Sequence, residues 1–417
     1  MLTTNPRFAY WAPRVACAIF ALTAVLSALW PRPGQEFLDL NIYHGAERAL
    51  FAGRDPYAFS LLTYPFTYPP FALLALAAAW VPVGVIEGVW LAAGLATTWY
   101  LARALARRWP DRFAAHRVTL TFGLAALLFA TGPVRADLDF GQISLFMVTA
   151  SFADAIGRPG RRWGGVAIGL CGAIKLTPLF FLPWLVVVGR GRDAARALAT
   201  FLACTAVAWL VAPGPSAYYW GHGVWQTSRV GDLAAVVNQS LHGLLVRSGM
   251  HGRAETICWL GLGGAVAVLT LMRAKSLHRQ GLVAQSAILA GCCSLVVSPV
   301  TWSHHETWTV LAAALLVVAG RRTATAGAVA VLVVALLPVS DVAPHVASAV
   351  LRWPLTNSRA LVSIALCLFA FRTRPPDYSA HRNALPSERT TDSGPRAGGP
   401  AVTDGDESCL KAPAPTP

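Results

Sequence analysis

Residues 39–70 of this 417-residue chain read DLNIYHGAERALFAGRDPYAFSLLTYPFTYPP. This is the first long polar stretch after an apolar run, and it sets carboxylates (Asp39, Glu47 and Asp55) beside several tyrosines. Nearly everything that follows is apolar. Carboxylates and aromatic side chains at the mouth of a bundle of apolar helices indicate a site for a hydroxyl-rich substrate at the surface of a bilayer. The side of the membrane on which the stretch lies therefore matters for every later inference.

The composition is that of a helical membrane protein. Hydrophobic residues make up 55% of the chain and charged residues 13%, which is far too apolar for a soluble protein of this length. A net charge of +14 could indicate nucleic acid in a soluble chain. Here the Lys and Arg residues lie in short loops between apolar runs, where they set topology, so no nucleic-acid partner is expected. The eight cysteines lie mostly in apolar runs, so no disulfide framework is expected.

Apolar runs and basic loops alternate along the chain and predict an all-α polytopic membrane protein. Lys and Arg are about twice as numerous in the loops on the side of the N-terminus, which predicts that both termini are cytoplasmic. The first run has no A-x-A site after it, so we expect an uncleaved helix rather than a signal peptide. About twelve transmembrane helices are expected, near residues 12–30, 83–101, 118–132, 142–156, 163–189 (two short helices), 197–212, 257–272, 282–298, 307–319, 324–338 and 357–371, with a partial helix at 71–81.

The predicted domains are a membrane domain, 1–374, and a tail, 375–417. The tail is rich in Pro, Gly, Ser, Thr and charged residues, so it is expected to be disordered and cytoplasmic. The alternation places 31–68, 213–256 and 299–306 outside. The polar clusters that could carry chemistry then collect at one extracytoplasmic face. Gly165 and Gly169 are interpreted as points of close packing between helices.

Asp39 is the leading candidate for a chemical role. A carboxylate at the outer head-group region could act as general base on a substrate hydroxyl. It could equally be a solvated loop residue or a helix cap. Asp55, between Gly53 and Pro56, looks like a turn residue.

Two histidines, His304 and His305, form the second candidate site. Adjacent histidines on a helix point about 100° apart and chelate a metal poorly, so no metal site is expected. They could donate hydrogen bonds to an anionic phosphate, or they could pack with Trp302 in an interfacial aromatic belt.

Other polar residues stand at the ends of apolar runs. Lys175 lies within an apolar stretch. It either has a functional role or extends its side chain so that the ammonium group lies at the membrane–water interface. Gln142 opens another run. Asn238 and Gln239, followed by Arg247, offer donors suited to sugar or phosphate oxygens.

Six segments together resemble a known enzyme family. They are DLNIYHGAERALFAGRDPY (39–57), FTYPPFALL (66–74), FGQISLF (140–146), AIKLTPLFFLPWL (173–185), VVNQSLHGLLVR (236–247) and SPVTWSHHETW (298–308). In this order they are similar to the actinobacterial integral-membrane glycosyltransferases of family 87, which include polyprenol-phosphate-mannose-dependent α-mannosyltransferases and related arabinofuranosyltransferases. The region after 309 carries no matching motif.

The resemblance implies a GT-C fold with an active site at the extracytoplasmic face of the plasma membrane. It implies a polyprenyl-phosphate sugar donor, most simply mannose, a glycolipid or glycan acceptor, and no metal or other cofactor. Asp39 would be the base of an inverting transfer. His304 and His305, aided by Lys175 and Arg247, would hold the donor phosphate. Substrate contacts are expected from the remaining candidates: Tyr43, Tyr68, Gln142, Asn238, Gln239 and Trp302.

Three alternatives stay open from the sequence. One is an arabinofuranosyltransferase that uses polyprenyl-phosphoarabinose. Another is a lipid transporter or flippase, although no inverted repeat is evident and the polar residues gather at one face. The third is a non-catalytic subunit of an envelope-assembly complex.

Overall fold

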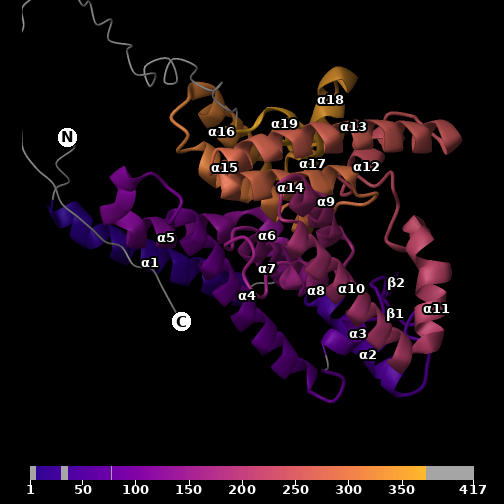
Figure 1. The fold of residues 1–417 in the computed structure, drawn as a ribbon. Coiled ribbons are helices and arrows are strands. Elements are labelled where there is room, and N and C mark those ends of the chain that lie inside the picture. The colour runs from indigo at the N-terminus through magenta and orange to yellow at the C-terminus, as the bar shows by residue number, and fades with distance from the viewer. Residues whose placement is uncertain (1–5, 30–35, 77, 372–417) are drawn as a thin grey trace, which may run out of the picture. The chain divides into compact units, whose positions relative to one another are not determined.

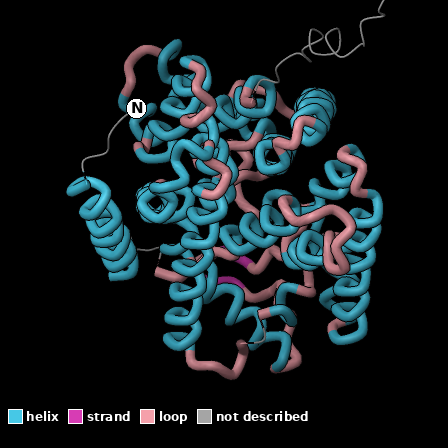
Figure 2. Tube along the Cα trace, turned by 60° about the vertical axis from the view of Figure 1, so that its left-hand side comes forward, coloured by secondary structure: helices cyan, strands magenta, loops and turns pink. Residues whose placement is uncertain are grey.

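The computed structural model describes residues 6–29, 36–76 and 78–371, and these residues are mostly helical (Figure 1). The first half contains α1 (Pro6–Leu29), α2 (Leu38–Phe51), α3 (Ala72–Ala75), α4 (Val83–Ala106), η1 (Asp111–His116), α5 (Arg117–Ala130), α6 (Gly132–Phe140), α7 (Ser144–Ala155), α8 (Val166–Ile174), η2 (Thr177–Phe180) and α9 (Phe181–Val187). Between α2 and α3, the two-residue strands β1 (Ser60–Leu61) and β2 (Tyr64–Pro65) form an antiparallel hairpin, magenta in Figure 2.

The second half continues in the same way. It contains α10 (Gly191–Val211), α11 (Pro213–Gly221), η3 (Gly223–Trp225), η4 (Thr227–Arg229), α12 (Leu241–Arg247), α13 (Gly252–Arg279), α14 (Val283–Val297), η5 (Ser303–His305), α15 (Thr307–Leu316), α16 (Arg322–Leu336), α17 (Val339–Val342), η6 (Ala343–His345), α18 (Ala349–Thr356) and α19 (Ser358–Phe369). Residues 375–417, predicted to be a disordered tail, lie outside the described residues.

Every apolar run predicted to cross a membrane coincides with a helix. Among the described residues, four helices are long and apolar enough to span a bilayer: α4, α10, α13 and the continuous helix Asp111–Ala130. A fifth candidate is α16 with α17 and η6, bent by 68° at its break. Helix α1 has 24 residues, whereas the remaining apolar helices are shorter than the roughly 20 residues that a crossing needs. The helices agree with a polytopic membrane protein, whereas the count of twelve crossings and the GT-C fold remain predictions.

Several segments expected to be loops contain short helices. Residues 132–140 form α6, which begins with a proline in its first turn and ends at Gly141 in the left-handed conformation. Proline at the start and glycine after the end are ordinary helix signals, but they bound only nine residues here. The partial helix predicted over 71–81 is shorter than expected, because only Ala72–Ala75 is helical.

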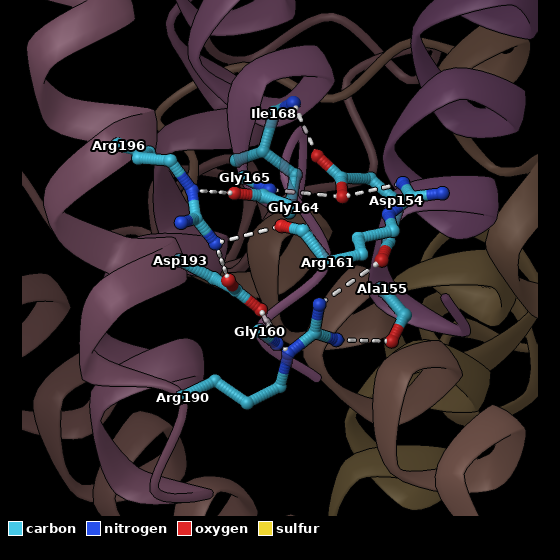
Figure 3. A network of polar contacts seen from close by, with 10 residues as sticks. All are labelled: Asp154, Ala155, Gly160, Arg161, Gly164, Gly165, Ile168, Arg190, Asp193 and Arg196. Atoms are coloured by element: carbon cyan, nitrogen blue, oxygen red, sulfur yellow. Dashed lines mark hydrogen bonds and ion pairs between the residues drawn. The ribbon is translucent and has the colours of Figure 1, made fainter. Parts of the chain in front are cut away.

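Two basic loops that were predicted to share one side of the membrane touch each other (Figure 3). The buried Asp154 carboxylate, at the end of α7, accepts a hydrogen bond from Arg161 at 2.9 Å. At the start of α10, Asp193 pairs with Arg190 at 2.7 Å and also with Arg196. Arg190 reaches back to the backbone of α7, and Arg196 reaches the backbone of the 156–165 loop. The charges are thus paired within each segment, and Arg190 and Arg196 join the two loops through hydrogen bonds to backbone carbonyls.

Helices α8 and α10 approach each other closely, as the two glycines of α8 predicted. A Cβ at Gly165 would lie 2.0 Å from the carbonyl oxygen of Asp193, and one at Gly169 would lie 2.2 Å from that of Ala197. No side chain fits at either contact. The close packing therefore fixes the first half of α8 against α10, and Lys175 follows the opposite end of α8.

Candidate active site

Helix α2 is anchored at its first residues against α6. Phe37, just before the helix, has φ 50°, and its N–H donates to the carbonyl of Asp139 at 2.8 Å. Leu40 and Ile42 are buried, and they hold one side of the helix in the core. Asp39 lies in the first turn, where the N-terminus of a helix favours a negative charge. Its side chain remains partly exposed.

A glycine brings the next residue of the site to Asp39. Gly141 ends α6 with φ 66°, and a Cβ built on it would lie 2.6 Å from the Cβ of Leu40. Only glycine satisfies both the backbone conformation and this contact. The following residue, Gln142, is 6% exposed, and its Nε2 donates to Asp39 Oδ2 at 2.7 Å.

Two tyrosines extend this contact into the protein. Gln142 Oε1 accepts from the hydroxyl of Tyr68 at 2.9 Å and lies 3.0 Å from that of Tyr43. The two hydroxyls are also 3.0 Å apart. Because both phenols face the carbonyl end of the side-chain amide, its NH₂ end is held toward Asp39. The tyrosines therefore orient the group that touches the candidate base.

Lys175 joins this chain from the end of α8. Its side chain is 9% exposed, so it is buried rather than extended to solvent along its own length. The Nζ atom donates to Ser144 Oγ at 2.9 Å and to the hydroxyl of Tyr68 at 3.1 Å, and it lies 2.7 Å from Nε2 of His305. One continuous series of polar contacts thus runs from Asp39 to His305.

His305 lies in η5, and its two ring nitrogens have different partners. The backbone N–H of Trp302 donates to Nδ1 at 3.1 Å, while Nε2 faces Lys175. With Nδ1 acting as acceptor, a neutral imidazole carries its proton on Nε2 and donates it toward Lys175. Lys175 can accept this hydrogen bond only as a neutral amine. Its own two N–H groups then donate to Ser144 and Tyr68. The contacts are therefore fully satisfied with Lys175 and His305 both neutral.

The pKa values of the pair are shifted toward these neutral forms, although Lys175, with a pKa of about 8, still carries its charge at neutral pH. The break after α8, helix α2 and η5 all lie outside the helices that could span a bilayer. Burial lowers the pKa of Lys175 to about 8, against the opposing charges of Asp137 and Asp39. Burial also lowers the pKa of His305 well below its usual value, and Lys175 adds to that effect. Burial raises the pKa of Asp39 to about 6, although the bond from Gln142 and the charge of Lys175 oppose the rise.

A small cavity adjoins Lys175 and His305. It has a volume of about 30 Å³, and its lining also includes Ser144, Thr301 and Trp308. That volume holds about one water molecule and no sugar. Asp39 and His305 are both partly exposed, whereas Lys175 is buried.

The second histidine is oriented differently. The ring of His304 packs edge-on against that of His305, with centroids 4.4 Å apart and planes at 85°. It is buried, with 7% exposure. The two rings therefore do not face one group together. Among the described residues, no cluster of three or more His, Cys, Asp or Glu side chains could hold a metal ion.

The candidates from residues 238–247 lie in another set of contacts. Asn238 Oδ1 accepts from the N–H of Thr301 at 3.0 Å, and the N–H of Gln239 donates to the Thr301 carbonyl at 2.7 Å. Arg247 donates to Asn357 and to the carbonyl of Asn238. These residues thus brace the segment before η5, and among the described residues no hydrogen bond joins them to Asp39. The buried Nη2 of Arg247 has no hydrogen-bond partner among the described residues.

Two polar residues of the site were not identified from sequence. Ser144 is the acceptor for Lys175, and Asp137 is a buried carboxylate whose Oδ1 accepts from the N–H of Leu145 at 3.1 Å. Ser144 belongs to the FGQIS motif (140–144), which was the available signal for it, whereas Asp137 lies three residues before that motif. Asp55, interpreted as a turn residue, accepts a bond from the N–H of Tyr57 at 2.9 Å, which confirms that interpretation.

Comparison with known proteins gives the class. Glycosyltransferase family 87 matches residues 66–299. The chain is 32% identical over 73% of its length to a polyprenol-phosphate-mannose-dependent alpha-(1-2)-phosphatidylinositol mannoside mannosyltransferase of Mycolicibacterium smegmatis, covering 76% of that protein. It is 31% identical over 68% of its length to the protein of the same name from Mycobacterium tuberculosis, covering 71% of it. No solved structure matches significantly.

These comparisons identify the protein as a membrane glycosyltransferase. Its apolar helices hold Asp39, Lys175 and His305 in one polar network. The chain belongs to glycosyltransferase family 87. The resemblance seen in its motifs is confirmed, and with it the expectation of an enzyme.

Proposed function

We propose that this enzyme transfers mannose from a polyprenyl-phosphate donor to a hydroxyl of a glycolipid of the phosphatidylinositol mannoside type, with inversion at the anomeric carbon. The names of its relatives support the donor and the acceptor class. The polar network from Asp39 to His305 supports the chemistry, because it sets a base and a phosphate-binding pair at one partly exposed place.

In the proposed step, Asp39 takes the proton of the acceptor hydroxyl. The hydroxyl oxygen attacks the anomeric carbon, the bond from that carbon to the phosphate oxygen breaks, and polyprenyl phosphate leaves with the electron pair. A base works best when its pKa lies near the working pH. The raised pKa of Asp39, about 6, meets that condition while leaving most of the carboxylate ionised at neutral pH. In this proposal Gln142 orients the carboxylate through its hydrogen bond to Asp39.

Lys175 and His305 are proposed to receive the negative charge that develops on the leaving phosphate. Preorganised donors of this kind act most strongly in a site that excludes water. A bound phosphate favours a proton on the pair, so His305 becomes able to donate from Nε2 toward the phosphate while Lys175 carries the charge behind it. Lys175 then acts through His305, and its partners Ser144 and Tyr68 keep it in place.

The remaining candidates keep supporting roles in this proposal. Tyr43 and Trp302 are proposed to line the sugar site, and His304 to pack against His305. Asn238 and Gln239 are proposed to contact substrate through the loop they hold. Arg247 is proposed to add positive charge near the donor through its unpartnered Nη2.

The cellular arrangement is also part of the proposal. We place the protein in the plasma membrane with a GT-C fold, about twelve crossings, both termini cytoplasmic and the site extracytoplasmic. A lipid-linked donor suits that face, and the mechanism draws on no metal or other cofactor. The bias of Lys and Arg among the loops supports the orientation.

The observation that carries the proposal is the contact series from Asp39 through Gln142, Tyr68 and Lys175 to His305. It is tested with purified protein, polyprenyl-phosphate mannose and a phosphatidylinositol mannoside, with polyprenyl-phosphoarabinose as the rival donor. Transfer of mannose alone is expected. Transfer of arabinose alone would show that polyprenyl-phosphoarabinose is the donor. No transfer with either donor would refute the proposed function.

A further inference from the structure

A groove lies on the side of α2 that faces away from the network. Its volume is about 630 Å³. Asn41, His44 and Arg48 form one wall, and residues 79–83, between α3 and α4, form the other. Phe51 and Ala52 close its end. The groove is far larger than the cavity beside Lys175.

The polar wall of the groove is suited to an anion. Arg48 is exposed, and its guanidinium has no hydrogen bond or ion pair among the described residues. Nε2 of His44 is buried and has no hydrogen-bond partner there. Two carboxylates lie near and are both engaged: Glu47 accepts from the N–H of Ala78, and Glu87 accepts weakly from Asn41. An unpaired guanidinium beside an unsatisfied imidazole is an arrangement that binds phosphate oxygens.

The rim of the groove is aromatic and exposed. Trp80 is 76% exposed and Phe51 is 44% exposed, with their rings 4.6 Å apart. Exposed tryptophan and phenylalanine beside a basic residue are typical of protein at the level of lipid head groups. A ligand here therefore presents an anionic head to Arg48 and an apolar body to the rim.

We propose that this groove binds the phosphodiester of a lipid head group, and that the lipid is the acceptor of the transfer. The second part rests on the proposed function above. Asp39 and Arg48 are nine residues apart, so they lie on opposite sides of α2 and about 14 Å apart along its axis. One hexose cannot join a phosphodiester in the groove to a hydroxyl at Asp39. The geometry fits an acceptor with several sugars, whose glycan passes around α2.

The test compares three exposed positions near the groove. Arg48→Gln removes the charge, and Ala52→Trp fills the groove without changing charge. Arg54→Gln is the matched control, because Arg54 is exposed on the same segment and does not line the groove. The KM for a phosphatidylinositol mannoside is measured against the KM for the donor and for octyl α-mannoside, which has no phosphodiester.

We expect Arg48→Gln to raise the KM for the phosphatidylinositol mannoside about 10- to 100-fold, the effect of losing a charge-assisted hydrogen bond. Ala52→Trp should also raise this KM, because the added side chain occupies the space of the head group. The KM values for donor and for octyl α-mannoside should not change, and Arg54→Gln should match the wild type. Unchanged acceptor KM in both groove variants, or an equal rise for both acceptors, overturns the acceptor assignment.

A second measurement separates the acceptor from bulk lipid. Protein is extracted from phosphatidylcholine nanodiscs that contain phosphatidylinositol, and retained phosphatidylinositol is measured by native mass spectrometry. Loss of this lipid in Arg48→Gln with an unchanged acceptor KM supports a phosphodiester site and overturns the acceptor as its occupant. Equal retention in Arg48→Gln and wild type overturns the site itself. This readout also holds if the wild type transfers no mannose, so the two proposals can fail separately.

Discussion

Replacing Asp39 by Asn separates a catalytic carboxylate from a structural one. Asn keeps the shape and an oxygen that can accept the bond from Gln142, but it takes no proton. We expect the rate of transfer to fall about 10²–10⁴-fold, which is the usual contribution of a positioned base. Membrane insertion and donor binding should persist, because the contacts of Gln142 with the tyrosines do not involve the lost charge.

The same replacement is expected to lower activity but to leave the stability of the fold unchanged or higher. The pKa of Asp39 is about 6 in the folded protein and about 3.8 as an ordinary side chain. The folded state therefore binds the proton more tightly, and the stability of the wild type falls as the pH rises from about 4 to 6. Keeping the carboxylate ionised at pH 7.5 then costs up to about 3 kcal/mol. Asp39→Asn removes this cost, so the variant should unfold at the same or a higher temperature than the wild type.

The assay combines turnover with thermal unfolding in detergent, each measured between pH 5 and 9. For wild type, kcat/KM should rise about tenfold per pH unit up to about pH 6, as the base ionises, and fall above about pH 8, where Lys175 loses its charge. The acid limb should be absent in any residual activity of Asp39→Asn. Asp55→Asn is the matched control, because the amide oxygen can still accept the turn bond from Tyr57.

Three results would refute this reasoning. An active Asp39→Asn enzyme beside an inactive Asp55→Asn enzyme would mean that the base is the other carboxylate. If both variants are active, neither Asp39 nor Asp55 is the catalytic base. An inactive Asp39→Asn protein that unfolds well below the wild type would show that Asp39 holds the fold, and its loss of activity would then say nothing about proton transfer.

Three further predictions test other parts of the structure. His305→Ala should reduce kcat at least about 10²-fold, while His304→Ala should be milder, because only His305 contacts Lys175; equal losses would contradict this difference. Gly141→Ala should lower kcat by displacing Gln142 from Asp39, whereas Gly53→Ala, also at positive φ but with open space around it, should keep the wild-type kcat; the two are compared by turnover at equal amounts of folded protein. Arg112→Cys, in a cysteine-free background, should not be labelled by an impermeant maleimide added to intact cells, and labelling from outside would reverse the proposed topology.

The helices were predictable from sequence to a useful degree, and their lengths less so. Apolar runs such as 83–101 and 257–272 fall within α4 and α13, because a long apolar run has few alternatives to a helix. The short helices between the runs were missed. α6 has nine residues and α18 has eight, too few for a periodic pattern to stand out from a polar loop.

Most residues of the polar network were singled out from the sequence, whereas their contacts with one another were not. Each of Asp39, Gln142, Lys175 and His305 stands at the end of an apolar run, and alternation of the runs brings such ends to one face. The contacts join residues 103 and 130 positions apart, so they depend on how each helix is rotated. That rotation comes from packing such as Gly141 against Leu40, which no local pattern reveals. Side chains that bond loop backbone, as Asn238 does, are unpredictable for the same reason.

The paired state of Lys175 and His305 has a consequence for the order of events. When both groups are neutral, the contacts of the pair are fully satisfied, since the N–H of Trp302 donates to Nδ1 of His305 and Lys175 accepts from Nε2. Such a pair attracts an anion less than a charged one until the anion itself raises the affinity for a proton. Above about pH 8, where Lys175 is neutral, donor binding is then coupled to proton uptake, and release of polyprenyl phosphate to its loss. Because Asp39 takes the proton of the acceptor hydroxyl in the same reaction, the two ends of the network are then protonated together at the moment of transfer.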